Sequence, residues 1–162
     1  MYVDNAVCLS PKAKDAQQVF GDLMKKGYVL TDEGPLSAFL GLQVNKSNGE
    51  IELTQPAFIE RIIKQVGLKD ERLHDTPADT ILKRDENGEE RKTEFHYRSV
   101  IGQLNYLAAT TRPEIQFAVH QCARFSQDPK MCHEKAVKRI VRYFEKNERK
   151  GTQVEGRQEK RN

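Results

Sequence analysis

Apolar residues recur at helical spacing in five stretches of the chain and alternate with polar residues in its first third. The helical stretches are residues 11–26, 56–66, 97–109, 113–125 and 130–144. In each of them the apolar side chains fall on one face, which predicts an amphipathic helix whose polar face meets solvent. The chain is therefore predicted to be rich in helix, with most of the helical residues in its second half.

Capping residues support the ends of these helices. Ser10-Pro11 and Asp128-Pro129 each place a capping side chain directly before a proline, which suits the first helical position because proline has no N–H to leave unsatisfied. Gly27 and Gly67 follow the last apolar residues of two segments. Glycine there favours a left-handed residue that ends a helix.

Strands are predicted before and between the first helices. Residues 2–9 read as a strand pair that turns at Asp4-Asn5, and residues 28–31 read as a short strand. Residues 36–44 and 50–54 are predicted to form a hairpin, because Asn48-Gly49 lies between them and Asn-Gly is a strong hairpin signal. Ile51 and Leu53 alternate with polar residues, which predicts one buried face.

Two polar stretches divide the chain. Residues 69–93 are predicted to be a polar linker, and residues 147–162 a disordered tail. The order of elements predicts an α+β fold, in which short antiparallel strands with two helices (residues 1–68) precede a three-helix lobe (residues 94–146).

Composition and charge indicate the cellular compartment and the kind of partner to expect. Residues 130–150 hold eight Lys or Arg against three Asp or Glu, in a chain whose net charge is only +3, so a polyanion such as nucleic acid is a candidate partner. No apolar run approaches the ~20 residues that a membrane span needs, and no signal sequence is evident. We expect an intracellular protein of the cytoplasm, or alternatively of the nucleus, without a membrane partner.

Cysteine usage agrees with that compartment. Cys8, Cys122 and Cys132 are odd in number and irregular in spacing, which is typical of free thiols in a reducing environment. His120 and His133 lie near two of them, but the spacing matches no common zinc pattern, and we expect no zinc site.

Seven segments, in order along the chain, resemble motifs of the reverse transcriptase of copia-type retrotransposons. They are YVDN at 2–5, FLGLQV at 39–44, LTQ with Phe-Ile at 53–59, Thr-Pro at 76–77, YRSVIGQLNYL at 97–107, TRPEI at 111–115 and HEKAVKRIVRY at 133–143. The family has YVDD, FLGI-x-V, LSQ-x-x-YI, TP, YRS-x-x-G-x-L-x-YL, TRPDI and HW-x-A-x-KRILRYL. Seven segments in register are far more specific than a single motif.

The resemblance implies a fold and an activity. Residues 1–68 would be an incomplete palm with the helix that follows it, and residues 94–146 a lobe of thumb and connection helices. The chain would be a fragment of a Gag-Pol polyprotein and of its RNA-directed DNA polymerase. Its partner would be an RNA or DNA template-primer, and its cofactor Mg²⁺.

The resemblance also identifies the candidate catalytic residue. Asp4 corresponds to the first aspartate of YVDD and would bind metal, whereas Asn5 replaces the second aspartate. Two Mg²⁺ about 4 Å apart stabilise the attacking and leaving oxygens of nucleotidyl transfer, and they require hard, charged oxygen ligands. In the family a further aspartate and the fingers lie upstream of this motif. We therefore expect this chain alone to be inactive and to bind Mg²⁺ weakly.

Two alternatives to a polymerase fragment remain open. Lys135, Lys138, Arg139 and Arg142 recur at three- and four-residue steps, so one helix face could follow a phosphate backbone in a non-enzymatic nucleic-acid-binding module; the competing interpretation is a solvated surface. An exposed sheet edge could instead pair with another protein chain.

Some family-like residues are expected to be structural. Arg112 could be a buried ion-pair partner or a phosphate contact, and the first is the default. Tyr97, Tyr106 and Tyr143 could stack on bases, but their places on helices favour the core or its rim.

Overall fold

The structure is a computed structural model, and it describes residues 8, 10, 12–31, 37–39, 41–47, 50–68, 73–92, 95–147 and 152–155. Asp4, Asn5 and nearly all of the predicted strand pair at residues 2–9 lie outside these ranges. The chain divides into two units, Met1–Ser37 and Ala38–Asn162. Each unit is described by itself below.

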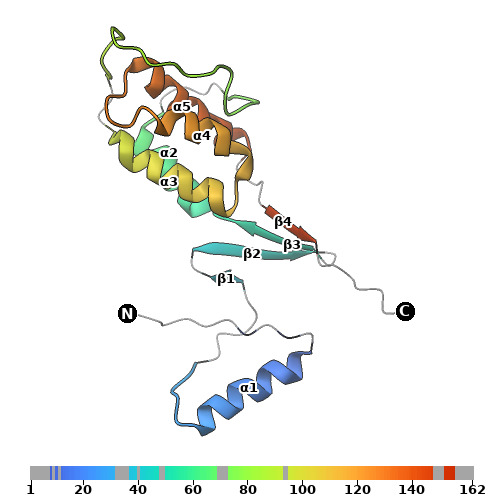
Figure 1. The fold of residues 1–162 in the computed structure, drawn as a ribbon. Helices are drawn as coiled ribbons and strands as arrows, with labels where there is room; N and C mark the ends of the chain where they lie inside the picture. Colours follow the sequence, from blue (N-terminus) through green and yellow to red (C-terminus); the bar gives the residue numbers. More distant parts are fainter. Residues whose placement is uncertain are drawn as a thin grey trace. The chain divides into compact units, whose positions relative to one another are not determined.

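The first unit contains helix α1 (Ala13–Lys25) (Figure 1). Ser10 lies before the helix and accepts a hydrogen bond from the backbone N–H of Lys12 through its hydroxyl, at 3.3 Å. Gly27 adopts φ +89° directly after the helix, a conformation that is strained for residues with a Cβ. The short strand predicted at residues 28–31 is wrong, because these residues pair with no other described strand.

The second unit begins with an antiparallel sheet in the order β1-β2-β3-β4. Its strands are β1 (Ala38–Phe39), β2 (Leu42–Ser47), β3 (Glu50–Thr54) and β4 (Thr152–Glu155). The predicted hairpin is confirmed as β2 and β3, with Val44 opposite Leu53. The predicted first strand is split, because Gly41 turns the chain at φ +80° between β1 and β2.

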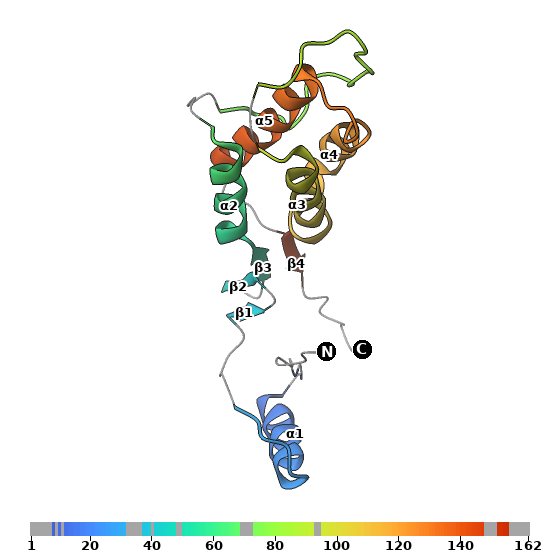
Figure 2. The same ribbon diagram turned by 90° about the vertical axis from the view of Figure 1, so that its left-hand side faces the viewer.

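Strand β4 corrects the prediction of a disordered tail. It lies within residues 147–162 and pairs antiparallel with β3 (Figure 2). In the register of this pair Val154 lies opposite Ile51. The sequence gives little sign of it, because the strand is short and polar apart from Val154. The free backbone groups along the outer edge of β3 provide the partner that local sequence cannot show.

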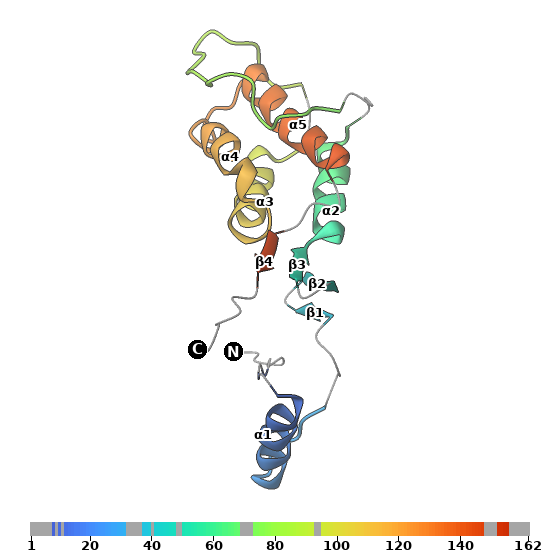
Figure 3. The ribbon, with the colours of Figure 1, turned by 90° about the vertical axis from the view of Figure 1, so that its right-hand side faces the viewer.

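Five helical segments follow the sheet and form one lobe. They are α2 (Pro56–Val66), α3 (Tyr97–Thr110), the 3₁₀ turn η1 (Pro113–Ile115), α4 (Gln116–Ala123) and α5 (Met131–Lys146). Figure 3 shows α2 and α3 beside each other; α5 packs on α2 and α4. The apolar faces of all five meet in one core, whose members Ile62, Leu104, Val119 and Phe144 are fully shielded from solvent.

The α+β class is confirmed, but the lobe contains one helix more than predicted. The sequence predicts that the lobe begins with the helix at residues 97–109. In the structure α2 is also part of the lobe. Ile59, Ile62 and Val66 of α2 are buried in the same core as the later helices. The boundary expected at residue 68 therefore does not separate packed units. The apolar stripe of α2 needs a partner surface, and α3 and α5 provide it.

Candidate nucleic-acid interface

Helix α5 carries the four basic residues predicted to bind nucleic acid. The helix begins at Met131, and His133 satisfies its first turn by accepting a hydrogen bond from the backbone N–H of Lys130 at Nδ1, at 2.9 Å. The prediction of Asp128 as N-cap and Pro129 as first helical residue is therefore two residues too early. A buried histidine side chain, rather than an aspartate, performs the capping.

The four cations do not form an open basic face. Lys135 is exposed. Lys138 binds Glu134 at 2.7 Å, and Arg139 binds Asp79 at 2.8 Å and two oxygens of Thr76. Half of the predicted phosphate contacts are thus engaged with carboxylates of the same chain.

Arg142 and Arg139 also face a histidine. His74 lies near both guanidinium groups, and its pKa is lowered by partial burial and then by the positive charges of Arg139 and Arg142. Arg142 is itself half-buried. Arg139 and Arg142 therefore face other atoms of the chain, and Lys135 is the one exposed residue among the four predicted cations.

The segment predicted to be a polar linker covers this side of α5. Residues 73–92 form no helix or strand, yet His133 Nε2 lies 3.1 Å from the carbonyl oxygen of Lys83, and the N–H of Met131 donates to the carbonyl of Glu89 at 2.8 Å. Ala78 and Leu82 pack against the core. The segment is a strap on the lobe, held by contacts that its polar composition does not predict.

A buried carboxylate lies beneath this strap. Glu134 is 1% exposed and meets Lys138 at 2.7 Å and Arg91 at 3.4 Å. The Arg91 guanidinium also lies over the rings of Phe95 and Tyr97, 4.7 and 5.2 Å from their centroids. The charges compensate one another inside the lobe, so this cluster joins strap to helix and is not available to an external phosphate.

Arg112 is a structural residue, as the default interpretation predicts. Its side chain is 1% exposed, donates to Glu114 at 2.6 Å and to the carbonyl of Asn147 at 3.2 Å, and lies over the ring of Phe144. It fixes the start of η1 against the end of α5. A phosphate could not reach it without opening the core.

The three tyrosines divide between core and rim. Tyr97 donates its hydroxyl proton to the carbonyl of Cys122 at 3.0 Å, and burial raises its pKa. Tyr143 is also buried, whereas Tyr106 on α3 is 46% exposed. Only Tyr106 is open to a ligand.

Tyr106 belongs to an open face on α3 that sequence reasoning missed. Arg98, Gly102 and Tyr106 follow one another at four-residue steps and are all exposed, so they share one side of the helix. Apart from its chain neighbours and the backbone of its own helix, no described atom lies within 4 Å of the position that a Cβ on Gly102 would occupy. We call Arg98, Gly102 and Tyr106 the α3 face. Its spacing was visible in the sequence, but its exposure was not.

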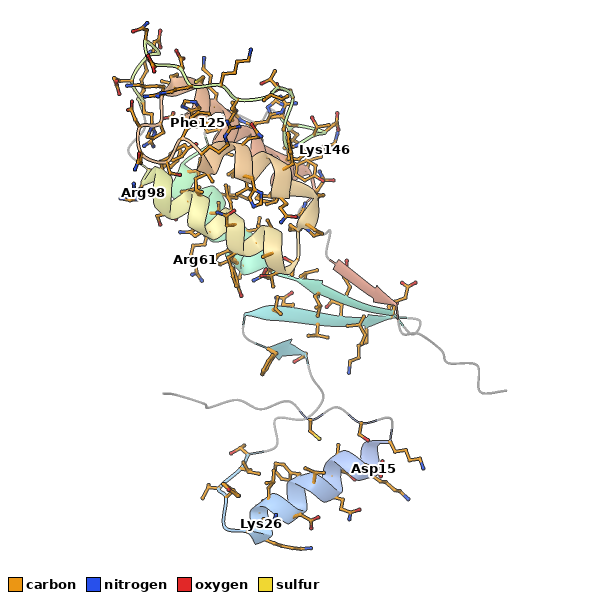
Figure 4. All side chains as sticks on the ribbon, in the orientation of Figure 1. Asp15, Lys26, Arg61, Arg98, Phe125 and Lys146 are labelled. Atoms are coloured by element: carbon orange, nitrogen blue, oxygen red, sulfur yellow. The ribbon has the colours of Figure 1, made fainter. Side chains whose placement is uncertain are left out.

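Neighbouring side chains of α2 extend the α3 face. Phe58 meets Tyr106 edge to face at 5.4 Å, and Arg61 lies over the ring of Phe58. Gln65 accepts a hydrogen bond from Gln103 at 2.8 Å. Within the described ranges neither Arg61 nor Arg98 forms an ion pair, and Figure 4 shows both projecting from the helices. In contrast to α5, this side of the lobe presents arginines that carboxylates do not neutralise.

Comparison with known proteins identifies the family. The chain is 30% identical to a putative transposon Ty5-1 protein of Saccharomyces cerevisiae over 146 residues, 89% of the chain. It is also 30% identical to the retrovirus-related Pol polyprotein from transposon TNT 1-94 of Nicotiana tabacum over 155 residues, again 89% of the chain. The chain belongs to the Pol polyproteins of retrotransposons. An uncharacterized mitochondrial protein of Arabidopsis thaliana is 26% identical over 88% of the chain.

This Pol polyprotein segment spans only part of its relatives. It covers 47% of the yeast protein and 11% of the tobacco polyprotein. No family model and no solved structure matches it. The retrotransposon origin predicted from the seven motif segments is thus confirmed, and the activity of the whole polyprotein is a separate question.

The described part of the Pol polyprotein segment shows neither a membrane-spanning helix nor a cluster of metal-binding side chains. None of its described helices combines the length and the apolar character needed to cross a bilayer. Among the described residues no three His, Cys, Asp or Glu side chains are grouped to hold a metal ion. Asp4 and Asn5, the predicted metal and catalytic positions, are not among those residues.

Thiol reactivity in the Pol polyprotein segment should follow burial. Cys8 is exposed, whereas burial raises the pKa of Cys132 and raises that of Cys122 to about 12. Only the thiolate reacts. We expect iodoacetamide at about pH 8 to modify Cys8 first, Cys132 slowly, and Cys122 only after denaturation. Peptide mapping by mass spectrometry measures this order, and rapid labelling of Cys122 in the folded chain would contradict it.

Proposed function

We propose that the chain is a segment of an RNA-directed DNA polymerase, the reverse transcriptase of a copia-type element, and that its helical lobe holds the template-primer. Support comes from the motif resemblance, the retrotransposon relatives and, above all, the α3 face. That face is exposed and contains the aromatic ring of Tyr106 and the cation of Arg98. Gly102 lies between them and has no side chain that would keep a partner away from the helix.

Each member of the α3 face suits a nucleic-acid duplex. Gly102 lets a sugar-phosphate backbone approach the helix axis more closely than any side chain would allow. Arg98 provides charge-assisted hydrogen bonds to phosphate oxygens. Tyr106 offers a flat surface to sugars or base edges. The shallow minor groove of an A-like duplex, such as an RNA–DNA hybrid, admits such a surface without base-specific contacts.

The basic face of α5 is less suited to this role. A non-enzymatic module acting through Lys135, Lys138, Arg139 and Arg142 would have to break the ion pairs with Glu134 and Asp79 before binding phosphate. Breaking the Lys138 pair is costly because Glu134 is buried, whereas the pair of Arg139 with the exposed Asp79 is weaker. Lys135 is the member of that set that remains a reasonable phosphate contact.

Catalysis would require residues 4 and 5 to bind metal ions. Asp4 offers one carboxylate and Asn5 a neutral amide oxygen, which is a poor donor set for two Mg²⁺ ions. We therefore propose that this segment contributes to polymerisation by binding the template-primer.

Substitution of Gly102 tests the proposal. Gly102→Leu should stabilise α3 by up to about 1 kcal/mol, because glycine is a poor helix former and no described atom outside the local helix backbone lies within 4 Å of the added Cβ. The same substitution should weaken binding of a fluorescent RNA–DNA hybrid by tenfold or more, on the order of the loss from a blocked central contact. Fluorescence anisotropy gives the affinity, and thermal denaturation gives the stability.

Gly21→Leu provides the matched control. Gly21 lies inside α1 and also has no described atom outside the local helix backbone within 4 Å of its Cβ position, so it should tolerate leucine and leave hybrid affinity unchanged. Equal affinity of Gly102→Leu and wild type would refute the α3 face as the duplex-binding surface.

A further inference from the structure

A second candidate site lies between the strap and helix α4. A cavity of about 350 Å³ opens there, lined by Pro77, Ala78, Asp79, Thr80, Ile81, Glu114, Phe117 and Ala118. This volume falls in the range of ligand sites. Ile81 is 68% exposed and Phe117 58% exposed, so large apolar side chains from two distant parts of the chain frame an open hollow. We call it the strap groove.

The backbone along the strap groove is free to pair. No backbone–backbone hydrogen bond of the described chain involves residues 77–82, and these residues form no strand or helix. The segment nevertheless has a fixed position, because Arg139 binds Thr76 and Asp79, while Ala78 and Leu82 pack on the core. A held segment with unpaired N–H and C=O groups can accept an added extended chain.

The charged residues of the strap groove indicate which kind of peptide could bind there. Its lining contains the carboxylates Asp79 and Glu114 and no Lys or Arg. Each carboxylate gives one oxygen to an arginine, Arg139 or Arg112, and the second oxygen of Glu114 accepts no hydrogen bond from the described residues. A lysine or arginine beside an apolar side chain could bind the second oxygen of Glu114 and complement this lining.

We propose that the strap groove is a peptide-binding site for an extended protein segment in which aliphatic or aromatic side chains alternate with lysine or arginine. An apolar side chain enters between Ile81 and Phe117, and its basic neighbours face Glu114 and Asp79. The backbone of the peptide pairs with residues 79–81. The proposal is independent of polymerase activity, because it involves no residue of the α3 face.

Binding of a designed peptide to the full chain tests the proposal. The probe is a fluorescein-labelled Lys-Leu-Lys-Phe-Lys peptide, measured by anisotropy with the chain at up to about 1 mM, where weak peptide contacts become visible. Two comparison peptides replace lysine by glutamate or the apolar residues by serine. We expect saturable binding of the first peptide and at least about tenfold weaker binding of the other two.

Variants locate the bound peptide. Phe117→Ser removes an exposed ring and should leave the fold intact while weakening the peptide about tenfold or more. Tyr106→Ser removes a similarly exposed ring from the α3 face and should leave peptide affinity unchanged. Absence of binding, equal binding of all three peptides, or an unchanged affinity of Phe117→Ser would overturn the proposal. Binding of a single-stranded oligonucleotide that Phe117→Ser weakens would do so as well.

Discussion

Glu134→Ala is expected to destabilise the lobe by about 3–5 kcal/mol, the loss typical of breaking a buried ion pair. Glu134 is 1% exposed and compensates both Lys138 and Arg91. Removing the carboxylate leaves two cations, 21% and 18% exposed, without their counterion, and it frees the strap residue Arg91 from helix α5. Urea denaturation followed by circular dichroism measures the change in the free energy of unfolding.

An exposed pair with the same spacing provides the control. Glu60 and Lys64 on α2 are also four residues apart and 2.8 Å from each other, against 2.7 Å for Glu134 and Lys138, but both side chains are more than half exposed. Lys64 lowers the pKa of Glu60 through a hydrogen bond and its charge, yet solvent screens such pairs. Glu60→Ala should leave the urea midpoint nearly unchanged. If the two alanine variants lose similar stability, burial does not decide the strength of the Glu134 cluster.

Primer extension is expected to be absent from residues 1–162 alone with Mg²⁺ or Mn²⁺, and to depend on residue 5 when the segment is placed in a complete polymerase. In a chimera, residues 2–147 of this chain would replace the matching segment of an active copia-type reverse transcriptase. Asn5→Asp in that chimera should raise the rate of nucleotide incorporation by about a hundredfold or more, because it restores a charged ligand where charge develops.

The chimera tests the assignment to a reverse transcriptase separately from the role of residue 5. Activity with Asn5→Asp supports the assignment of the segment to a reverse transcriptase, and low activity with Asn5 supports the electrostatic role of that position. A folded chimera that remains inactive with Asn5→Asp would refute the assignment. Robust incorporation by the isolated chain would refute the view that one carboxylate is too few. Asn105→Asp, a substitution of the same kind on α3, should not raise the rate.

The ion pairs of α5 change the interpretation of its charge. A count of lysines and arginines makes residues 130–150 the most basic part of the chain, but Asp79, Glu134 and Asp75 each bind one of these cations. The carboxylates come from the same helix or from the strap, up to 71 residues away in sequence. A charge cluster therefore predicts an interface only when its counterions are known.

The sequence by itself determined the retrotransposon family, the α+β class and the approximate position of each described helix, because these depend on local periodicity and motif order; the helix starts shifted by up to two residues. It also indicated that Arg112 is structural and that β2 and β3 form a hairpin. Only the tertiary structure decided that α2 joins the lobe, that residues 73–92 lie on α5, that β4 pairs with β3, and which helix presents free arginines. Those outcomes depend on contacts between residues far apart in the chain. Burial and charge neutralisation are properties of such contacts, and no local pattern contains them.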